Sequence, residues 1–377
     1  MINEVSYISN IISTGSPAAN LFWLSQYEEE NFAKIHKFLI GPDYIAYRLT
    51  GKIQTDYCEA STSSLCDLKT GTWSEEIRRL FKFPRDIYPE IKGTCEVCGI
   101  VTKQWQEKFH FKQDVKVLTG TGDNPAAAIA TGCFAKGYPV LSLGTSGVLM
   151  YPKKKINFEV KGKNILFSMD GKDVLILVQG VVQSTGSSLA WWVKNTLQAD
   201  DFMEETTGVD LKHLGENELM FYPHLVGDKT IYQDPELRGS FVGIGTDTTR
   251  KEMTIAVMEG IAFAVKQLVS VMGVSKEELA RLKVTGGGSK NEVWMQILAD
   301  VLNTKVEQLE SGAGAGYGIA LCAAAAGDEN LSMNDLIEQT VSIKNTFIPR
   351  QYNRELYEQK YQKYLRVYDA LKHIYQE

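Results

Sequence analysis

Residues 140–151 read VLSLGTSGVLMY, and this stretch decides the fold. Two apolar runs of β-type residues, Val140 to Leu143 and Val148 to Tyr151, flank the turn Gly144-Thr145-Ser146-Gly147. Apolar runs on either side of a short turn that contains glycine predict a β-hairpin. A third apolar run, Val174 to Val178, follows. We therefore expect three strands before the first helix of this half of the chain.

Helices and strands alternate after these three strands. Leu189, Val193 and Leu197 recur at helical spacing within Gln183 to Leu197, and a longer apolar stripe predicts a core helix over Arg250 to Met272. The other expected elements are strands at Leu219 to Tyr222, Leu282 to Thr285 and Lys305 to Leu309, a helix opened by the capping-box pattern Ser289 to Glu292, a Gly/Ala-rich helix over 312–327 and a polar helix over Leu356 to Tyr368. The order βββαβαβα is that of an actin-like, ribonuclease-H-like half-domain, a compact α/β unit.

The region before Val140 has fewer predicted strands. A helix is expected near Leu21 to Lys37, a short strand and a helix over Phe38 to Leu49, an irregular polar stretch over 51–75, and a strand at Val115 to Leu118. After that strand, residues 120–125 read GTGDNP and lead into an alanine-rich helix. No three-stranded opening sheet is predicted here. We therefore expect two domains, residues 1–134 with only the tail of a first half-domain and residues 135–377 with a complete second one.

Composition limits the classes of partner. The chain has 377 residues, 44% of them hydrophobic and 23% charged, which is typical of a folded globular protein. Its formal charge of −6 provides no basic field for a polyanion, so no nucleic-acid partner is expected. No uninterrupted apolar stretch of about 18 residues and no signal-peptide pattern is found. We expect a cytoplasmic protein without a membrane partner.

Cysteine, histidine and tryptophan patterns predict no special site. The six cysteines include a single C-x-x-C pair, Cys95 and Cys98, without a second pair at zinc-site spacing, so reduced thiols are expected. The five histidines show no ligand spacing, and no protein metal site is expected. Trp191 and Trp192 are interpreted as packing residues.

Three turns carry candidate functional residues, and each has a plainer interpretation. The turn at Gly144 could hold a nucleotide phosphate or be an ordinary hairpin turn. Gly286-Gly287-Gly288 could offer bare backbone to the flat ring of adenosine or simply separate a strand from a helix. Asp123 could be a general base at the end of a strand or the N-cap of the following helix. The P-loop and dinucleotide-binding fingerprints are both absent from the sequence.

The order and spacing of these segments resemble the FGGY family of carbohydrate kinases, and within it the xylulokinase-like members most closely. The resemblance runs from about Gly15 to the C-terminal region. The segments that carry it are GSPAANLFWL (15–24), RLTGKIQTDYCEAS (48–61), TGTGDNPAAAIATG (119–132), LSLGTSGVL (141–149), DPELRGSFVGI (234–244), VTGGGSKNEVWMQILADVL (284–302) and ESGAGAGYGIALCAAAAG (310–327).

The resemblance implies an actin-like ATPase fold, ATP and Mg²⁺ as cofactors, and a small-molecule sugar substrate. The implied reaction is the phosphorylation of a ketose, with D-xylulose expected. The implied site residues are Asp123 as the base that takes the proton of the sugar hydroxyl, Asn124 as the residue that orients it, Gly144, Thr145 and Ser146 as the phosphate turn, and Gly287, Gly288 and Asn291 as the adenine and ribose contacts.

The sequence also departs from the family pattern. Asn20 stands where the family signature has lysine, and Asp228-Lys229 where many members have Glu-Arg. The opening Asp-x-Gly-Thr hairpin of the family, which contacts phosphate and Mg²⁺, is not found, and neither are its Met-His and Trp-x-Asp sugar contacts. The alternatives are a kinase for another pentulose, hexulose or polyol, a non-catalytic nucleotide-binding remnant, or part of a split kinase with a separately encoded N-terminal segment. A homodimer is also allowed.

Overall fold

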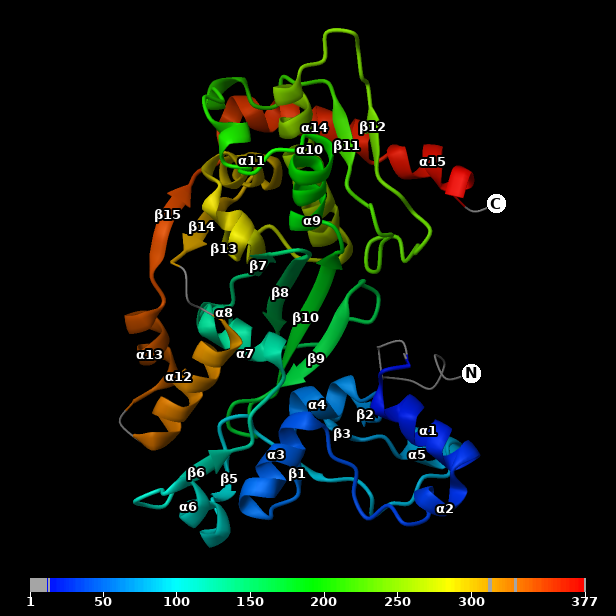
Figure 1. The fold of residues 1–377 in the computed structure, drawn as a ribbon, viewed down its shortest axis with the longest axis vertical. Helices are drawn as coiled ribbons and strands as arrows, with labels where there is room; N and C mark the ends of the chain where they lie inside the picture. Colours follow the sequence, from blue (N-terminus) through cyan, green and yellow to red (C-terminus); the bar gives the residue numbers. More distant parts are fainter. Residues whose placement is uncertain (1–11, 13, 311–313, 329–330, 376–377) are drawn as a thin grey trace.

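The computed structural model describes residues 12, 14–310, 314–328 and 331–375 (Figure 1). In these residues the largest sheet has seven strands in the order β15-β14-β13-β7-β8-β10-β9. Strands β7, β13 and β14 are parallel, whereas β8, β10, β9 and β15 each pair antiparallel with their neighbours. The bounds are β7 Val140–Leu143, β8 Gly147–Lys153, β9 Lys163–Phe167, β10 Leu175–Val182, β13 Arg281–Thr285, β14 Lys305–Leu309 and β15 Ile343–Phe347. This sheet organises the second half of the chain.

Helices cover both faces of the sheet, and successive residues of β7 show this. Val140 packs in the cluster of helices α7 (Asp123–Ala130) and α8 (Cys133–Lys136). Its neighbour Leu141 packs in the larger core that contains helices α10 (Arg250–Val271) and α11 (Glu292–Leu302). Successive side chains of a strand point to opposite faces, so the two clusters lie on opposite sides of the sheet. Figure 1 shows α10 and α11 above the sheet and α7 and α8 beside its lower part.

The part of the chain before β7 is built from short elements. In its described residues the sheets have two strands each. The strands are β1 Gln54–Asp56 with β4 Glu90–Lys92, β2 Cys66–Asp67 with β3 Thr72–Trp73, and β5 Val97–Ile100 with β6 Lys116–Leu118. The helices are α1 Pro17–Tyr27, α2 Glu29–Phe32, α3 Gly41–Thr50, α4 Tyr57–Thr62, α5 Glu75–Leu80 and α6 Lys103–Phe109.

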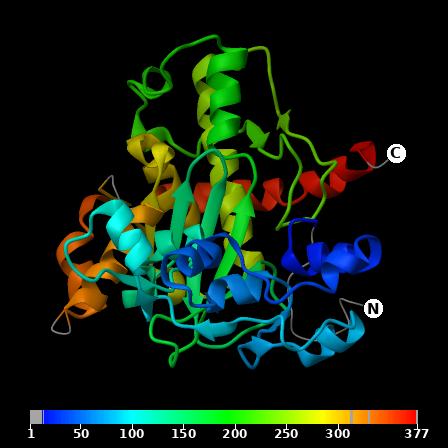
Figure 2. The ribbon, with the colours of Figure 1, turned by 60° about the horizontal axis from the view of Figure 1, so that its bottom comes forward.

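This first part is joined directly to the central sheet. The backbone N–H of Leu166 in β9 donates to the Ser61 hydroxyl at 3.0 Å, and the N–H of Thr94 donates to the Ser168 carbonyl at 2.8 Å. Figure 2, in which the bottom of the molecule comes forward, shows the N-terminal helices (blue) in front of the strands of the sheet. Helix α12 (Ala315–Gly327) packs closely on α7, because a side chain at Gly318 would lie 1.9 Å from the Ala126 carbonyl oxygen.

Helix α10 forms the centre of the larger core. Thr249 and Glu252 form a capping box at its start, and its middle turns are buried. An 18-residue window of this helix has a mean hydropathy of 1.5, so it is long and apolar enough to cross a membrane, although 78% of the window is buried inside the protein. The predicted core helix over Arg250 to Met272 is therefore confirmed as α10, with its end one residue earlier. The C-terminal helix α14 (Gln351–Tyr364) lies on α10, where the buried Lys360 ammonium contacts the Glu259 carboxylate at 2.6 Å.

The predicted bounds of β7 and β14 are confirmed, and several other predictions need correction. Strand β9 was not predicted, so four strands precede the first helix. The helix expected over Gln183 to Leu197 is α9 (Gly186–Ala190) followed by a π-helix over Trp191–Thr196. The predicted strand at Leu219 to Tyr222 is β11 Met220–Tyr222, which pairs with β12 Ser240–Val242. Elements not predicted as such are β12, helix α13 Met333–Thr340, strand β15, and the division of the last helix into α14 and α15 Val367–Tyr375. Residues 312 and 313 of the predicted Gly/Ala-rich helix lie outside the described residues.

Candidate active site

The turn between β7 and β8 is held in place by the start of α9. The Gly144 carbonyl accepts hydrogen bonds from the Gly186 N–H at 2.9 Å and the Thr185 hydroxyl at 3.0 Å. The Thr145 carbonyl accepts from both the N–H and the hydroxyl of Ser187, each at 3.0 Å. A side chain at Gly186 would lie 2.4 Å from the Gly144 carbonyl oxygen, so this approach requires glycine. The hairpin turn therefore has a fixed shape.

The second glycine turn follows β13 and approaches the first one. Gly286 has φ of 95°, a left-handed conformation, and a side chain there would lie 2.7 Å from the Leu143 carbonyl oxygen. A side chain at Gly288 would meet both Leu143 and Trp294 at 2.8 Å. At Gly287, in contrast, an added Cβ would meet nothing within 4 Å. Gly287 is therefore the glycine of this turn whose outer side is open.

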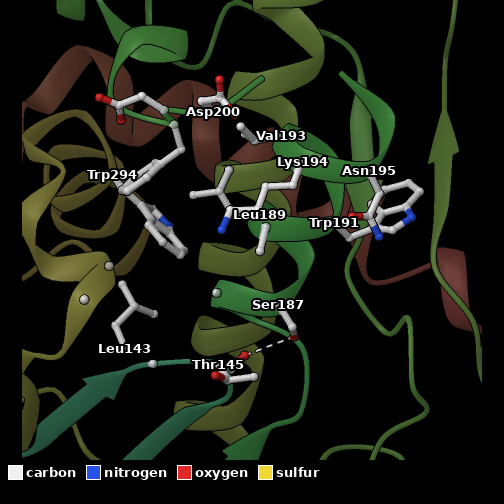
Figure 3. Close-up of a pocket in the computed structure, with 17 residues that line it drawn as sticks. Leu143, Thr145, Ser187, Leu189, Trp191, Val193, Lys194, Asn195, Asp200 and Trp294 are labelled. Atoms are coloured by element: carbon white, nitrogen blue, oxygen red, sulfur yellow. Dashed lines mark hydrogen bonds between the residues drawn. The ribbon is translucent and has the colours of Figure 1, made fainter. Parts of the chain in front are cut away.

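A cavity of about 700 Å³ lies between the two turns and the segment 186–202, which comprises α9, the π-helix and the loop that follows (Figure 3). Of the residues predicted from the sequence, Gly144, Thr145, Gly287 and Gly288 line it. Figure 3 shows Leu143 and Trp294 on one side of the cavity and Leu189 and Lys194 on the other, with the Thr145–Ser187 hydrogen bond at its lower end. A concave site of this size, mostly apolar with a few convergent polar groups, is typical of a small-ligand pocket.

Several lining residues were not predicted from the sequence. Ser187, Lys194, Asn195, Asp200 and Asp201 belong to the wall, and they share no motif that would single them out. Both members of the tryptophan pair pack in the larger core, as predicted. Trp192 is 3% exposed and its indole N–H donates to the Thr254 hydroxyl at 2.9 Å. Trp191 is partly buried and stacks on Phe221, and it also lines the cavity.

Ser146 and Asn291 are not among the residues that line this cavity. Asn291 is fully buried at the N-cap of α11, where its side-chain oxygen accepts from the Trp294 N–H at 2.9 Å. Its amide group donates to the Thr206 hydroxyl at 2.9 Å. Helix α11 thus has Asn291 as its N-cap and Glu292 as its first residue, and the capping box expected at Ser289 is replaced by a 3-10 helix over Gly287–Lys290. The structure assigns Asn291 to holding the turn, and a contact with a nucleotide stays a prediction.

Asp123 and Asn124 begin helix α7. Asp123 is exposed and is the first residue of the helix, whose N-cap is Gly122, so the alternative interpretation of Asp123 as the N-cap is wrong. Its Oδ1 accepts from the Asn124 N–H at 2.7 Å. A second cavity of about 760 Å³ lies between this helix, at Ala127, and the turn at Gly286 and Gly287. The second glycine turn and the middle of α7 thus face one cavity, whose wall includes neither Asp123 nor Asn124.

A group of acidic residues lies behind the loop that carries Asp123. A side chain at Gly122 would lie 3.1 Å from Glu59 Oε1 and from Cys58 Sγ. Burial raises the pKa of Glu59 and of Asp43 to about 7, and the pKa of Asp56 to about 6. The charge of Asp56 contributes further to the higher pKa of Glu59. Removal from water disfavours the charged carboxylate, so these groups retain their protons at higher pH than free carboxylic acids do.

In the described part of the chain, one group of three side chains has the geometry to hold a metal ion. It consists of Asp56, Cys58 and Glu59, whose ligand atoms lie within 4.8 Å of one another. Asp56 already caps helix α4, because its Oδ1 accepts from the Glu59 N–H at 2.9 Å. Burial also raises the pKa of the Cys58 thiol. Since metal ligands must be deprotonated, the raised pKa values oppose metal binding here.

The fold and the cavity together define an actin-like, ribonuclease-H-like α/β protein with a ligand site at the ends of its strands. The model of the C-terminal domain of the FGGY family of carbohydrate kinases matches residues 140–327, and the model of the N-terminal domain of that family matches residues 4–130. The chain belongs to the FGGY family of carbohydrate kinases. It is therefore a carbohydrate kinase by family, a class of enzyme that takes its phosphoryl group from ATP.

The chain is similar to several relatives over nearly its whole length. It is 32% identical to a xylulose kinase of Lactococcus lactis over 95% of this chain and 72% of the relative. It is 30% identical to a xylulose kinase of Bacillus subtilis over 97% of this chain and 72% of the relative. A crystal structure of a "xyloylose kinase" from Brucella ovis superimposes with a TM-score of 0.87 at 28% identity, covering 98% of this chain and 75% of that one. The expectation of a shortened first half-domain stays a prediction, which these comparisons do not support.

Proposed function

We propose that this protein transfers the γ-phosphoryl group of ATP to D-xylulose and forms D-xylulose 5-phosphate. The observation that carries the proposal is the similarity to two curated xylulose kinases at 30% and 32% identity over almost the entire chain. The turn between β7 and β8, whose shape is fixed by hydrogen bonds, and the adjoining cavity of about 700 Å³ agree with a nucleotide substrate. Phosphoryl transfer depends mainly on positioning and on charge stabilisation, which such a site can supply.

Asp123 is the proposed general base. Its carboxylate is exposed at the first turn of α7, and one of its oxygens is oriented by the N–H of Asn124. In the proposed reaction the second oxygen takes the proton from the attacking sugar hydroxyl as the bond to phosphorus forms. Asn124 orients the sugar beside it. The helix N-terminus also favours negative charge, which suits a phosphate group approaching this point.

The cavity of about 700 Å³ is the proposed ATP site. The turn formed by Gly144, Thr145 and Ser146 would receive the phosphates, while the open side of Gly287 with Gly288 would contact adenine. Mg²⁺ is the proposed divalent ion. The oxygen donors present, among them the Thr145 hydroxyl, fit an ion that takes most of its ligands from phosphates and water. When bound, the ion would neutralise charge on the phosphates.

Steady-state kinetics over a panel of sugars test this proposal. The purified chain is assayed for ADP formation with D-xylulose, D-ribulose, D-fructose, gluconate and glycerol at equal concentrations, and the product is identified by mass spectrometry. We expect the highest kcat/KM with D-xylulose. A higher kcat/KM with another sugar would overturn the substrate assignment, and ADP formation that no sugar increases would overturn the proposed kinase activity.

The remaining proposals concern organisation. We propose that residues 1–134 and 135–377 are the two domains, because the family models match residues on either side of this boundary. We also propose a cytoplasmic location, since the apolar helix α10 is mostly buried inside the fold. A homodimer and a separately encoded N-terminal segment stay predictions. The molar mass of the purified chain, measured by light scattering, tests the homodimer.

A further inference from the structure

The C-x-x-C motif of the sequence is divided by the fold. Cys98 lies in β5, is 7% exposed and has its Sγ 3.6 Å from the Thr50 hydroxyl. Cys95 is half-buried in the loop before β5 and packs in a different cluster, which contains Cys322 of helix α12. Cys95 also lines a cavity together with Ala325 and Ala326 of helix α12, about one turn along that helix from Cys322. The cysteine that shares a packed cluster with Cys95 is therefore one that is distant in the sequence.

The backbone holds both cysteines in this arrangement. The N–H of Cys95 donates to the Met169 carbonyl at 2.9 Å, and the preceding N–H, of Thr94, donates to Ser168. The loop that carries Cys95 is thus attached to the segment that follows β9. Cys322 lies in the middle of α12, on the face that packs with Ile129 and Phe167. The two thiols thus belong to one packed cluster but to separate elements, an arrangement from which a disulfide can form once the two sulfurs approach each other.

Solvent reaches Cys95 but not Cys322. A cavity of about 300 Å³ is lined by Cys95, Glu96, Met169, Asp170, Ala325, Ala326 and Met333. Cys322 is 1% exposed and is not part of the cavity wall. A small molecule in this cavity would therefore meet the sulfur of Cys95 first, with Cys322 behind it.

We propose that Cys95 and Cys322 form a reversible disulfide in exchange with a low-molecular-weight disulfide. In the first step the Cys95 thiolate attacks one sulfur of the small disulfide, whose S–S bond breaks and releases one thiolate. In the second step the Cys322 sulfur attacks Cys95, its proton passes to the released thiolate, and the second small thiol leaves. The protein loses two hydrogen atoms and two electrons, and the small disulfide is reduced to two thiols.

The electrostatics of the pair support this order of steps. The interaction with Cys322 lowers the pKa of the Cys95 thiol, whereas the same interaction, followed by burial, raises the pKa of the Cys322 thiol. The thiolate is the attacking species in disulfide exchange, so Cys95 is the residue that reacts first. The other buried cysteines with a resolved shift, Cys58, Cys66 and Cys133, have raised pKa values and are inert by comparison.

The disulfide would connect the two parts of the chain. Cys95 lies within the region matched by the N-terminal domain model, and Cys322 lies within the region matched by the C-terminal domain model. A covalent bond between them would fix helix α12 against the loop before β5. Closing so long a loop of chain restricts the unfolded state and stabilises the folded one. The inference does not depend on the proposed kinase reaction, because its test requires no substrate.

Thiol counting after exposure to oxidised glutathione tests the proposal. The folded, reduced chain is incubated with oxidised glutathione, quenched in acid, denatured, alkylated and weighed by mass spectrometry. We expect the loss of two of the six alkylatable thiols, the release of two glutathione molecules per chain and a cross-linked peptide that contains residues 95 and 322. The variant Cys98→Ser is the matched control and should lose the same two thiols. Cys95→Ser should lose none, and Cys322→Ala should stop at a glutathione adduct on Cys95.

Other results would overturn the proposal. They are a wild-type chain that keeps all six thiols, a bond that maps to Cys95 and Cys98, and an adduct on Cys95 that never resolves in the wild type. Circular dichroism checks that each variant folds. If Cys322→Ala does not fold, two measurements still decide whether the disulfide forms. They are the cross-linked peptide of the wild type and the number of thiols that Cys95→Ser loses, a variant of a half-buried position.

Discussion

Replacing Gly287 with valine tests the proposed adenine contact most directly. An added Cβ at this position meets nothing within 4 Å, and the backbone is not in the left-handed region, so the turn can accept a side chain without strain. The stability of Gly287→Val should therefore change by only about 0.5 kcal/mol or less. The added methyl groups would project into the cavity that Gly287 lines, onto the surface proposed for the adenine ring.

The cost to binding follows from crowding. Extra methyl groups in a close-packed contact typically cost about 1–3 kcal/mol, which corresponds to a rise in Kd for ATP of about 5- to 150-fold. The measurement is calorimetric titration with ATP and Mg²⁺, together with thermal unfolding of the free protein. Gly287→Ala should show a smaller rise in the same direction, because alanine adds only one carbon.

Gly288→Val is the matched control one residue away. A side chain there would lie 2.8 Å from both Leu143 and Trp294, so this variant should unfold at a clearly lower temperature. The expected contrast is weak binding with normal stability at Gly287 and low stability at Gly288. Normal ATP affinity in Gly287→Val would refute the platform role. A large fall in the stability of Gly287→Val would refute the description of this position as open.

Three further predictions concern other residues. Asp123→Asn should lower kcat by about 10²-fold or more while ATP binding persists, and an unchanged kcat would leave Asp123 only a helix-terminal role. Burial raises the pKa of Glu59 from its ordinary 4.5 to about 7, so the folded state binds more protons than the unfolded state between these values and loses stability as pH rises through them. Glu59→Gln should therefore raise the unfolding temperature relative to wild type at pH 8 but hardly at pH 5, and equal shifts at both would contradict this. Lys360→Met removes the ammonium group that pairs with the buried Glu259 carboxylate and should lower the free energy of unfolding in urea by about 3–5 kcal/mol. The exposed Lys363→Met is the control and should lower it by about 1 kcal/mol or less. Equal losses in the two variants would be inconsistent with a buried pair.

The sequence predicted elements wherever local pattern and tertiary context agree. Strands β7 and β14 are continuous apolar or alternating runs between clear turns, and both were predicted with their observed bounds. Strand β9 begins with Lys163-Asn164, a weak local signal, and forms only because β10 pairs with it. Strand β15 is mostly exposed and polar, and it depends on β14 in the same way. Pairing energy that comes from a distant strand leaves little trace in the local sequence.

The start of α11 shows a second limit of local reasoning. Ser289 and Asn291 are both good N-cap residues, and the capping-box spacing to Glu292 favoured Ser289. The close approach of Gly286 to the Leu143 carbonyl shapes the turn as a 3-10 helix, which moves the first residue of α11 to Glu292. The choice between two equivalent caps was therefore decided by a neighbouring strand.

The sequence by itself determined the fold class, the family and the turns that carry the candidate site, because these depend on residue types at short, fixed spacing. Only the tertiary structure decided which residues share one cavity, that Trp191 lines it while Asn291 does not, and that Cys95 packs in the cluster of Cys322 whereas Cys98 does not. The physical reason is that contacts between distant segments, and the burial that shifts the pKa of Glu59, arise only when the sheet and helices pack together.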